Sequence, residues 1–304
     1  MSSADAAHEW RPATRRHALH QMCRRMSRTR VLDVAPRLTL LLLVLYSGRY
    51  WDLNIPIALC AALGMCSPHL IRCTWYWTTI GAVLMFGNLG RVYVVDNHKL
   101  LMSYWCVAIS LCLARRSERA LGVNARVLIG LCFSFAVLWK TLSPDYLNGA
   151  FFHYTLLVDG RFTRFASIVA GISPTVLASN VAELRALQPS VNALANLEST
   201  ESVALLSKIV TWWGYSLELA IAVAFLAPLD GLYRLRNPLL LTFLVTTYVV
   251  APVIGFGWLL CIMGFAQCGC REVSARVCYI ACFLLLQLFL LPWATLLGVA
   301  YRAY

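Results

Sequence analysis

The feature that most constrains this chain is a series of apolar stretches, each about 15 to 25 residues long, separated by breaks rich in charge, Pro or Asn. A helix that rises 1.5 Å per residue needs about 20 apolar residues to cross roughly 30 Å of hydrocarbon. The composition agrees, because the chain is 60% hydrophobic and 13% charged with a mean hydropathy of +0.68, values outside those of soluble domains. Since hydrocarbon leaves unpaired backbone groups unsatisfied, the spans should be helices. The sequence therefore predicts an all-α polytopic membrane protein.

About eight transmembrane helices fit the lengths of these stretches. The seventh contains Pro252, which removes a helical hydrogen bond, so this stretch is either one long kinked helix or two segments that meet at the proline. In the second case the C-terminus changes sides of the membrane. The expected spans are 37–50, 55–70, 75–95, 99–114, 125–139, 203–227, 239–266 and 277–300.

The basic residues indicate the orientation of these spans. The formal net charge is +12, and only three of the 26 basic residues are lysine. Arginines outnumber acids before the first span, which is typical of a cytoplasmic N-terminus. Counting spans places the arginines of 115–126, and Arg234 with Arg236, on the same side. Arg271 and Arg276 fall outside if the seventh span is one helix. Because the charge sits between apolar spans, we expect no nucleic-acid partner.

The chain divides into a basic arm and one transmembrane domain. The polar arm, residues 1–36, is too long for a signal peptide and lacks a cleavage pattern, so we expect a cytoplasmic tail of a multi-pass inner-membrane protein. Residues 37–304 form the transmembrane domain. Within it, residues 141–202 are expected at the outer face as one or two interfacial or re-entrant helices without a core of their own.

The 12 cysteines do not predict a metal site. Most of them lie in or beside apolar spans, where cysteine behaves as a small hydrophobic residue. No CxxC occurs, and residues 268–270 are a lone CxC.

His98 and Lys140 are the first candidate site residues. In a hairpin of the fourth and fifth spans, each is 21 residues from Arg119, so both should reach the same outer level. Two interpretations stay open. They form a site, or His98 lies at a helix start capped by Asn97 and its neighbour while Lys140 extends to the interface.

The residues around this pair resemble a known family. Residues 97–101 read NHKLL and residues 140–149 read KTLSPDYLNG, and 63–65 read LGM. Together they resemble the horizontally transferred transmembrane (HTTM) domain, which includes vitamin K-dependent γ-carboxylase. The specific likeness covers roughly residues 55–152, and beyond that it rests on hydropathy.

The resemblance implies an outward-facing site in which a lysine deprotonates vitamin K hydroquinone and a histidine supports the chemistry. His98 matches the family histidine. The family has two adjacent lysines where this chain has Lys140 and Thr141, and the catalytic one corresponds to Thr141. The chain also leaves no room for the large extracytoplasmic domain of the carboxylase, so we do not expect a peptide carboxylase. A quinone or hydroquinone is the small molecule that the resemblance suggests.

Glu218 is the third candidate catalytic residue, because an ionised carboxylate well inside a span costs several kcal/mol unless it is paired. Arg91 and Lys208 are its candidate partners. In the enzyme hypothesis Lys140 is the base, since burial disfavours an ammonium, His98 assists and Glu218 relays the proton. The residues expected to bind the substrate are Asn97, Trp139, Asp145 and Tyr146.

Two classes of function stay open. One is a membrane enzyme acting on a lipophilic quinol-like substrate at the outer face. The other is a non-catalytic membrane subunit or carrier, DoxX-like or transporter-like, in which the polar residues pair the helices. The first requires His98, Lys140 and Glu218 to converge on one pocket, and the second predicts separate, individually satisfied groups. Membrane lipids are the partners expected in either case, and the sequence indicates no particular protein partner.

Overall fold

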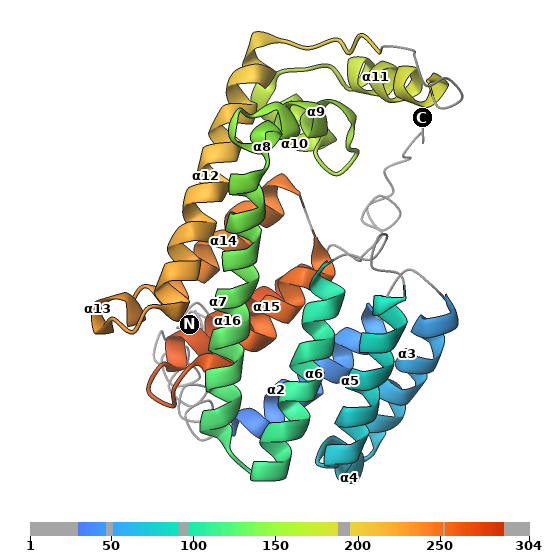
Figure 1. Ribbon diagram of the computed structural model, residues 1–304. Helices are drawn as coiled ribbons and strands as arrows, with labels where there is room; N and C mark the ends of the chain where they lie inside the picture. Colours follow the sequence, from blue (N-terminus) through green and yellow to red (C-terminus); the bar gives the residue numbers. More distant parts are fainter. Residues whose placement is uncertain (1–29, 47–50, 91–96, 188–194, 252, 289–304) are drawn as a thin grey trace, which may run out of the picture.

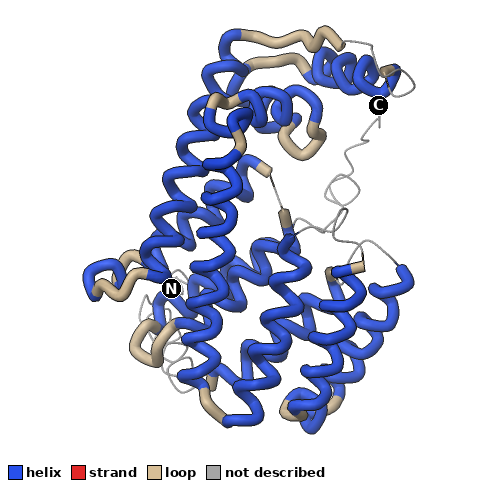
Figure 2. Tube along the Cα trace, in the orientation of Figure 1, coloured by secondary structure: helices blue, strands red, loops and turns tan. Residues whose placement is uncertain are grey.

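The computed structural model describes residues 30–46, 51–90, 97–187, 195–251 and 253–288 (Figure 1). Within these ranges every regular element is a helix and no strand occurs, which confirms the all-α prediction (Figure 2). The helices are α2 (Val31–Leu45), α3 (Trp51–Cys66), α4 (Pro68–Ile71), α5 (Thr74–Leu89), α6 (Asn97–Arg115), α7 (Glu118–Leu142), α8 (Pro144–Leu147), α9 (Ala150–Val158), α10 (Thr163–Ala170), α11 (Pro174–Ala186), α12 (Glu201–Leu226), α13 (Asp230–Tyr233), α14 (Arg236–Val250), α15 (Ile254–Gln267) and α16 (Val273–Gln287).

Two helices, α7 and α12, are long and apolar enough to cross a membrane by length and composition. They correspond to the fifth and sixth expected spans, and the side chains of Ser117 and Thr200 cap their N-termini. Helices α3, α15 and α16 are apolar but shorter. Most of the basic arm (1–29) and parts of the first, third and eighth expected spans (47–50, 91–95 and 289–300) lie outside the described residues.

The seventh expected span consists of two helices, so the two-segment alternative holds. Helix α14 ends at Val250 and α15 begins at Ile254, on either side of the proline position that cannot donate a helical hydrogen bond. The Tyr248 hydroxyl donates to the Val253 carbonyl across this break.

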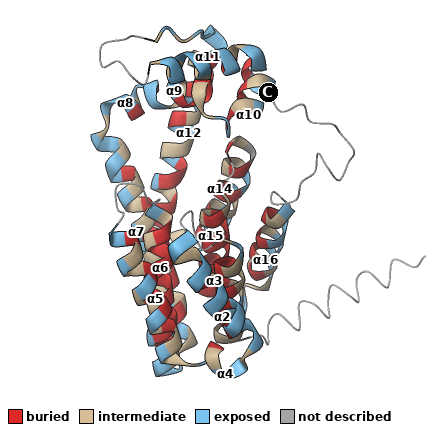
Figure 3. Cartoon of the chain, turned by 90° about the vertical axis from the view of Figure 1, so that its right-hand side faces the viewer, coloured by how far each residue is buried: buried red, intermediate tan, exposed pale blue. Residues whose placement is uncertain are grey.

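Helix α15 lies at the centre of the main core. Nearly all of its residues are buried, and buried residues gather around it in the lower part of the molecule (Figure 3). Trp77, Trp105 and Trp258 are fully buried in the same core. Three α15 glycines each receive a tyrosine ring so closely that an added Cβ would lie 2.0–2.5 Å from it. The pairs are Gly255 with Tyr46, Gly257 with Tyr248, and Gly264 with Tyr279.

Helices α7 and α12 pack along each other at one side of this core (Figure 1). Gly130 makes the close approach possible, because a Cβ at this position would lie 2.5 Å from Leu226. Both helices extend towards a group of shorter helices, α8–α11, which we call the cap.

The cap differs from the expectation of one or two helices without a core. It contains four helices, and α9–α11 share a small apolar cluster with the start of α12, including Leu156, Phe162 and Val203. Gly149 and Gly171 adopt positive φ values of 88° and 69° at the beginning of α9 and the end of α10, where residues with a Cβ would be strained.

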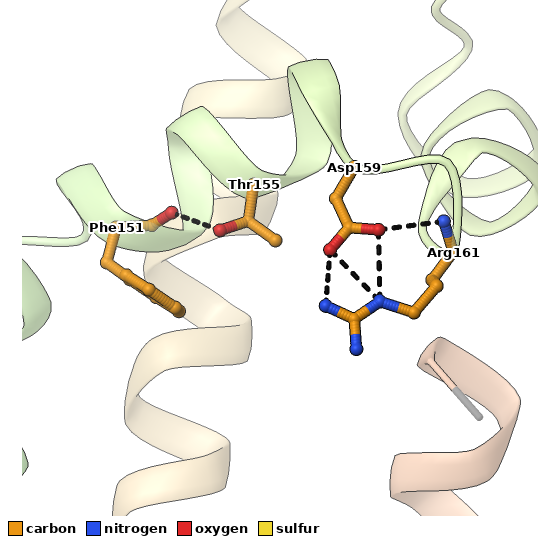
Figure 4. A network of polar contacts seen from close by, with 4 residues as sticks. All are labelled: Phe151, Thr155, Asp159 and Arg161. Carbon is orange, nitrogen blue, oxygen red and sulfur yellow. Dashed lines mark hydrogen bonds and ion pairs between the residues drawn. The ribbon is translucent and has the colours of Figure 1, made fainter. Parts of the chain in front are cut away.

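Polar contacts also order the cap. Thr155 donates to the Phe151 carbonyl within α9, and the Asp159 carboxylate faces the Arg161 guanidinium, with Oδ2 and Nη2 2.5 Å apart (Figure 4). The Asn180 side chain makes two 2.9 Å hydrogen bonds with the backbone of Glu198, which attach α11 to the segment before α12.

Candidate functional site

The centre of the candidate site is an ion pair between α7 and α12. Lys140, in the last turn of α7, places its Nζ 2.5 Å from Oε2 of Glu218. The side chains are 20% and 11% exposed, so neither is fully in solvent and neither is sealed inside. A carboxylate within an apolar helix requires such a partner. The structure therefore brings together two of the three predicted catalytic residues.

The partner of Glu218 is not one of the two that the sequence suggested. Lys208 is exposed and lies ten residues earlier on the same helix, whereas the neighbouring helix supplies Lys140. Arg91, the other suggestion, lies outside the described residues. Residues ten apart on one helix are separated by nearly three turns, about 15 Å of rise, so Lys208 is on the wrong turn.

The aromatic ring of Tyr146 packs against the Lys140 side of the ion pair. Its ring centroid is 4.8 Å from Lys140 Nζ, within the range of a cation–π contact. The Tyr146 hydroxyl is buried and has no hydrogen-bond partner within the described part of the chain. It lies beside Gly214 of α12, where an added Cβ would be 3.6 Å away. Burial, followed by the charge of Glu218, raises the pKa of the Tyr146 phenol above its ordinary value. The phenol therefore keeps its proton and can donate a hydrogen bond to a ligand.

Thr141, the residue after Lys140, also contacts α12. Its Oγ1 is 3.0 Å from the Tyr215 hydroxyl and also donates to the Val137 carbonyl at 2.8 Å. Since the threonine proton goes to the carbonyl, Tyr215 is the donor to Thr141. Tyr215 and Glu218 are three residues apart and share a face of α12. Lys140 and Thr141 thus both contact one stripe of α12, although they are adjacent in sequence.

His98 packs against other elements. Its ring stacks on Tyr46, with centroids 5.9 Å apart, and lies 6.1 Å from the Phe256 ring. These residues come from the end of α2 and the beginning of α15. Phe256 in turn lies 6.3 Å from Phe133, two turns before Lys140 on α7.

The level of His98 differs from that of Lys140 because the hairpin turns at Arg116 and Ser117, not at Arg119. Measured from this turn, Lys140 is about five residues, or roughly 7 Å, further along its helix than His98. The expected equal height of the two residues is therefore wrong.

The remaining predicted binding residues lie at the surface. Asn97 begins α6 and is exposed, Asp145 is exposed at the beginning of α8, and Trp139 is 76% exposed on α7. Of the four residues predicted to contact a substrate, Tyr146 is the one in contact with Lys140. Tyr215 and Gly214 were missed, although their spacing from Glu218 on one helix was available as a signal.

Two cavities of about 650 and 670 Å³ lie elsewhere in the structure. Both contain residues of the α7 N-terminal turn, and neither is lined by His98, Lys140 or Glu218. Among the described residues no group of three or more His, Cys, Asp or Glu side chains is placed to hold a metal ion.

Comparisons with protein-family models, with curated proteins and with solved structures gave no match. The structure defines an all-α protein with two helices able to cross a membrane, and a lysine–glutamate pair where those two helices meet.

Proposed function

We propose that the protein is a multi-pass inner-membrane protein with a cytoplasmic N-terminus, and that the Lys140–Glu218 pair exchanges a proton with a lipophilic, quinol-like substrate. The observation that carries this proposal is the partly exposed ion pair against the ring of Tyr146, whose buried hydroxyl has no hydrogen-bond partner among the described residues. A hydroxyl-bearing lipid would meet an acceptor, a positive charge and a donor at one place.

The proton transfer can be written with these three groups. The substrate O–H gives its proton to the Glu218 carboxylate, which leaves a carboxylic acid and a substrate oxyanion. The Lys140 ammonium, 2.5 Å from Glu218, stabilises the oxyanion, and the Tyr146 hydroxyl donates a hydrogen bond to it. In this step Glu218 is the base and the Lys140 ammonium is the electrostatic partner, so the base role expected for Lys140 passes to Glu218.

The membrane arrangement is part of the same proposal. Helices α7 and α12 support it by length and composition, and the shorter apolar helices α3, α15 and α16 fit beside them. With the arginine-rich 115–126 region inside, the Lys140 end of α7 faces outward. The resemblance to the HTTM domain supports an outward lysine acting on a hydroquinone, with Lys140 one position before the family's catalytic lysine.

A specific observation favours the alternative, a non-catalytic subunit or carrier. Lys140 and Glu218 already neutralise each other, while His98 packs separately on Tyr46 and Phe256. Such an arrangement is also what two helices need in order to pair in a bilayer.

The test uses a probe whose ionised form can be seen. A long-chain 4-nitrophenol is titrated into the purified full-length protein in neutral detergent, and phenolate absorbance is recorded. The proposal predicts more phenolate in the presence of the wild type than with Lys140→Met. The control is Lys208→Met, an exposed lysine on α12, which should behave as the wild type.

Equal phenolate signals for the wild type and Lys140→Met would refute the proton-transfer site. Loss of thermal stability in Lys140→Met without any change of the probe signal would then leave the helix-pairing role. Mass spectrometry of co-purifying lipids adds a direct observation, because a ring-bearing hydroxylated lipid retained by the wild type and lost from Lys140→Met identifies the substrate class.

A further inference from the structure

The second feature with chemical consequences is the cavity of about 650 Å³ at the opposite end of α7. The beginnings of α7 and α14 and the connection from α15 to α16 surround it. Four arginines line it: Arg119, Arg126, Arg236 and Arg276. Glu118 is the acidic residue in the lining. Four guanidinium groups around a cavity of this size form a strongly positive site.

Arg236 is the most informative of the four. The residue is 3% exposed, and its guanidinium carbon lies 3.6 Å from the centroid of the Tyr233 ring. Its Nε donates to the Tyr233 carbonyl at 3.3 Å, whereas its Nη2 is buried without a hydrogen-bond partner in the described ranges. A buried charged donor without an acceptor is costly. A ligand that supplies an acceptor removes this cost.

Arg126 likewise has a buried guanidinium donor without an acceptor in the described part of the chain. Its Nε is also buried without a hydrogen-bond partner among the described residues. Burial lowers the pKa of the Arg236 guanidinium, Tyr233 and Glu272 oppose this effect, and the charge of Arg126 adds to it. Two arginines therefore destabilise each other across the cavity unless negative charge lies between them.

The nearest additional carboxylate is already occupied by neutral donors. Glu272 accepts hydrogen bonds from Asn237 at 2.9 Å, from the Gly269 backbone at 2.7 Å and from the Tyr233 hydroxyl at 3.2 Å. Even if both Glu118 and Glu272 are counted against Arg119, Arg126 and Arg236, these described side chains carry a net charge of +1. In the neighbouring cavity, by contrast, Arg72 is paired with Asp33 at 3.1 Å.

We propose that the arginine-lined cavity binds a phosphate-type anion, with Arg236 and Arg126 as its principal donors. Guanidinium groups present planar pairs of N–H donors that match phosphate oxygens, and such charge-assisted bonds are the strongest class of hydrogen bond in proteins. The phosphate can belong to an anionic lipid headgroup or to a soluble phosphate. This site is separate from the Lys140–Glu218 pair and does not depend on the function proposed for it.

The experiment measures thermal unfolding of the full-length, delipidated protein in neutral detergent at constant ionic strength. Short-chain phosphatidylglycerol, short-chain phosphatidylcholine, inorganic phosphate and pyrophosphate are titrated separately. We expect saturable stabilisation of the wild type by at least one anionic phosphate. Loss of one charge-assisted contact should raise the concentration required at least about tenfold.

The variants are Arg236→Gln and Arg126→Gln, and the second keeps the test valid if the first does not fold. Arg234→Gln is the matched control, because Arg234 is exposed two residues away and is not part of the cavity lining. Stabilisation by phosphatidylglycerol and not by phosphatidylcholine, weakened in the two cavity variants alone, assigns a lipid headgroup. Stabilisation by phosphate or pyrophosphate alone supports the site with a soluble ligand. No stabilisation by any anion, or equal responses of Arg126→Gln and Arg234→Gln, would overturn the proposal.

Discussion

The two ends of α7 hold charge in opposite ways. At the C-terminal end Lys140 is neutralised by Glu218 from a neighbouring helix, with 2.5 Å between the charged atoms. At the N-terminal end Arg119, Arg126 and Arg236 line a cavity in which Glu118 is the one carboxylate among the described lining residues. The described residues therefore compensate the charge at one end of α7 and leave positive charge in excess at the other.

At one end of α7 stability depends on a partner side chain, and at the other end it depends on a bound ligand. In a compensated pair each charge neutralises the other, so removing one member leaves a buried charge without its partner. An uncompensated cluster costs free energy in the isolated chain and lowers it only when a ligand binds. Four sets of substitutions test this difference between the two ends of α7.

The largest effect is expected for Lys140→Met. The substitution leaves the Glu218 carboxylate largely buried and unpaired, which should cost about 3 kcal/mol of unfolding free energy. Equilibrium unfolding in detergent measures this loss, and Lys208→Met serves as the control with less than about 0.5 kcal/mol. Equal losses in the two variants would show that the ion pair contributes nothing specific.

The next effect is a recovery. Replacing both partners in Lys140→Met/Glu218→Met removes the charge as well as its counterion, so the double variant should return to within about 1 kcal/mol of the wild type. The same unfolding measurement gives the coupling between the two sites. A double variant less stable than Lys140→Met would mean that Glu218 has a second stabilising partner.

Arg236→Gln should behave differently from Lys140→Met in buffer free of phosphate and added lipid. Loss of the contact with the Tyr233 ring is offset by removal of an uncompensated charge, so the change should stay within about 1 kcal/mol. Comparing its unfolding midpoint with that of Arg234→Gln checks this. A loss as large as that of Lys140→Met would show that Arg236 is compensated, and the contrast between the two ends would fail.

The smallest effect is expected in the cap, outside both regions. The hydrogen bonds from Arg161 hold the pKa of Asp159 below its ordinary value (Figure 4). The contribution of the Asp159–Arg161 pair to the free energy of unfolding is therefore complete above a pH of about 3.9, the ordinary pKa of an aspartate. This contribution is lost as the pH falls further. Because the pair is exposed, Asp159→Asn should cost less than about 1 kcal/mol at neutral pH. The unfolding midpoints of the wild type and of Asp159→Asn should converge as the pH is lowered from 6 to about 3. A difference that stays constant over this range would show that the ion pair is not the cause of the difference in stability.

The sequence predicted the helical class and gave the break between α14 and α15 as one of two alternatives at the proline, because both depend on local properties. Lys140, Glu218 and Tyr146 could be singled out individually for the same reason, since each is a polar group beside or within an apolar run. Their contact could not be predicted, because 78 residues separate Lys140 from Glu218 and the rotation of α7 against α12 depends on packing at positions such as Gly130.

The errors have equally local causes. A shift of the α6–α7 turn by three residues was enough to separate the levels of His98 and Lys140. In the sequence, the arginines of the cavity indicate only the orientation of the spans. Their positions in separate loops do not show that four side chains will line one cavity. In the cap, Gly149 and Gly171 divide a stretch that hydropathy alone presents as one weakly apolar segment.

The three tyrosine rings seated on α15 have a consequence for how the protein is made. Residues 254–267 leave the ribosome after α2, α6 and α7, and yet they pack against all three of these helices. The faces of α2, α6 and α7 that pack against α15 therefore stay uncovered until this late segment is synthesised. A nascent chain stopped before residue 254 would lack its centre, and the time between the synthesis of α7 and that of α15 is when the protein most needs protection by the cell's insertion and quality-control machinery.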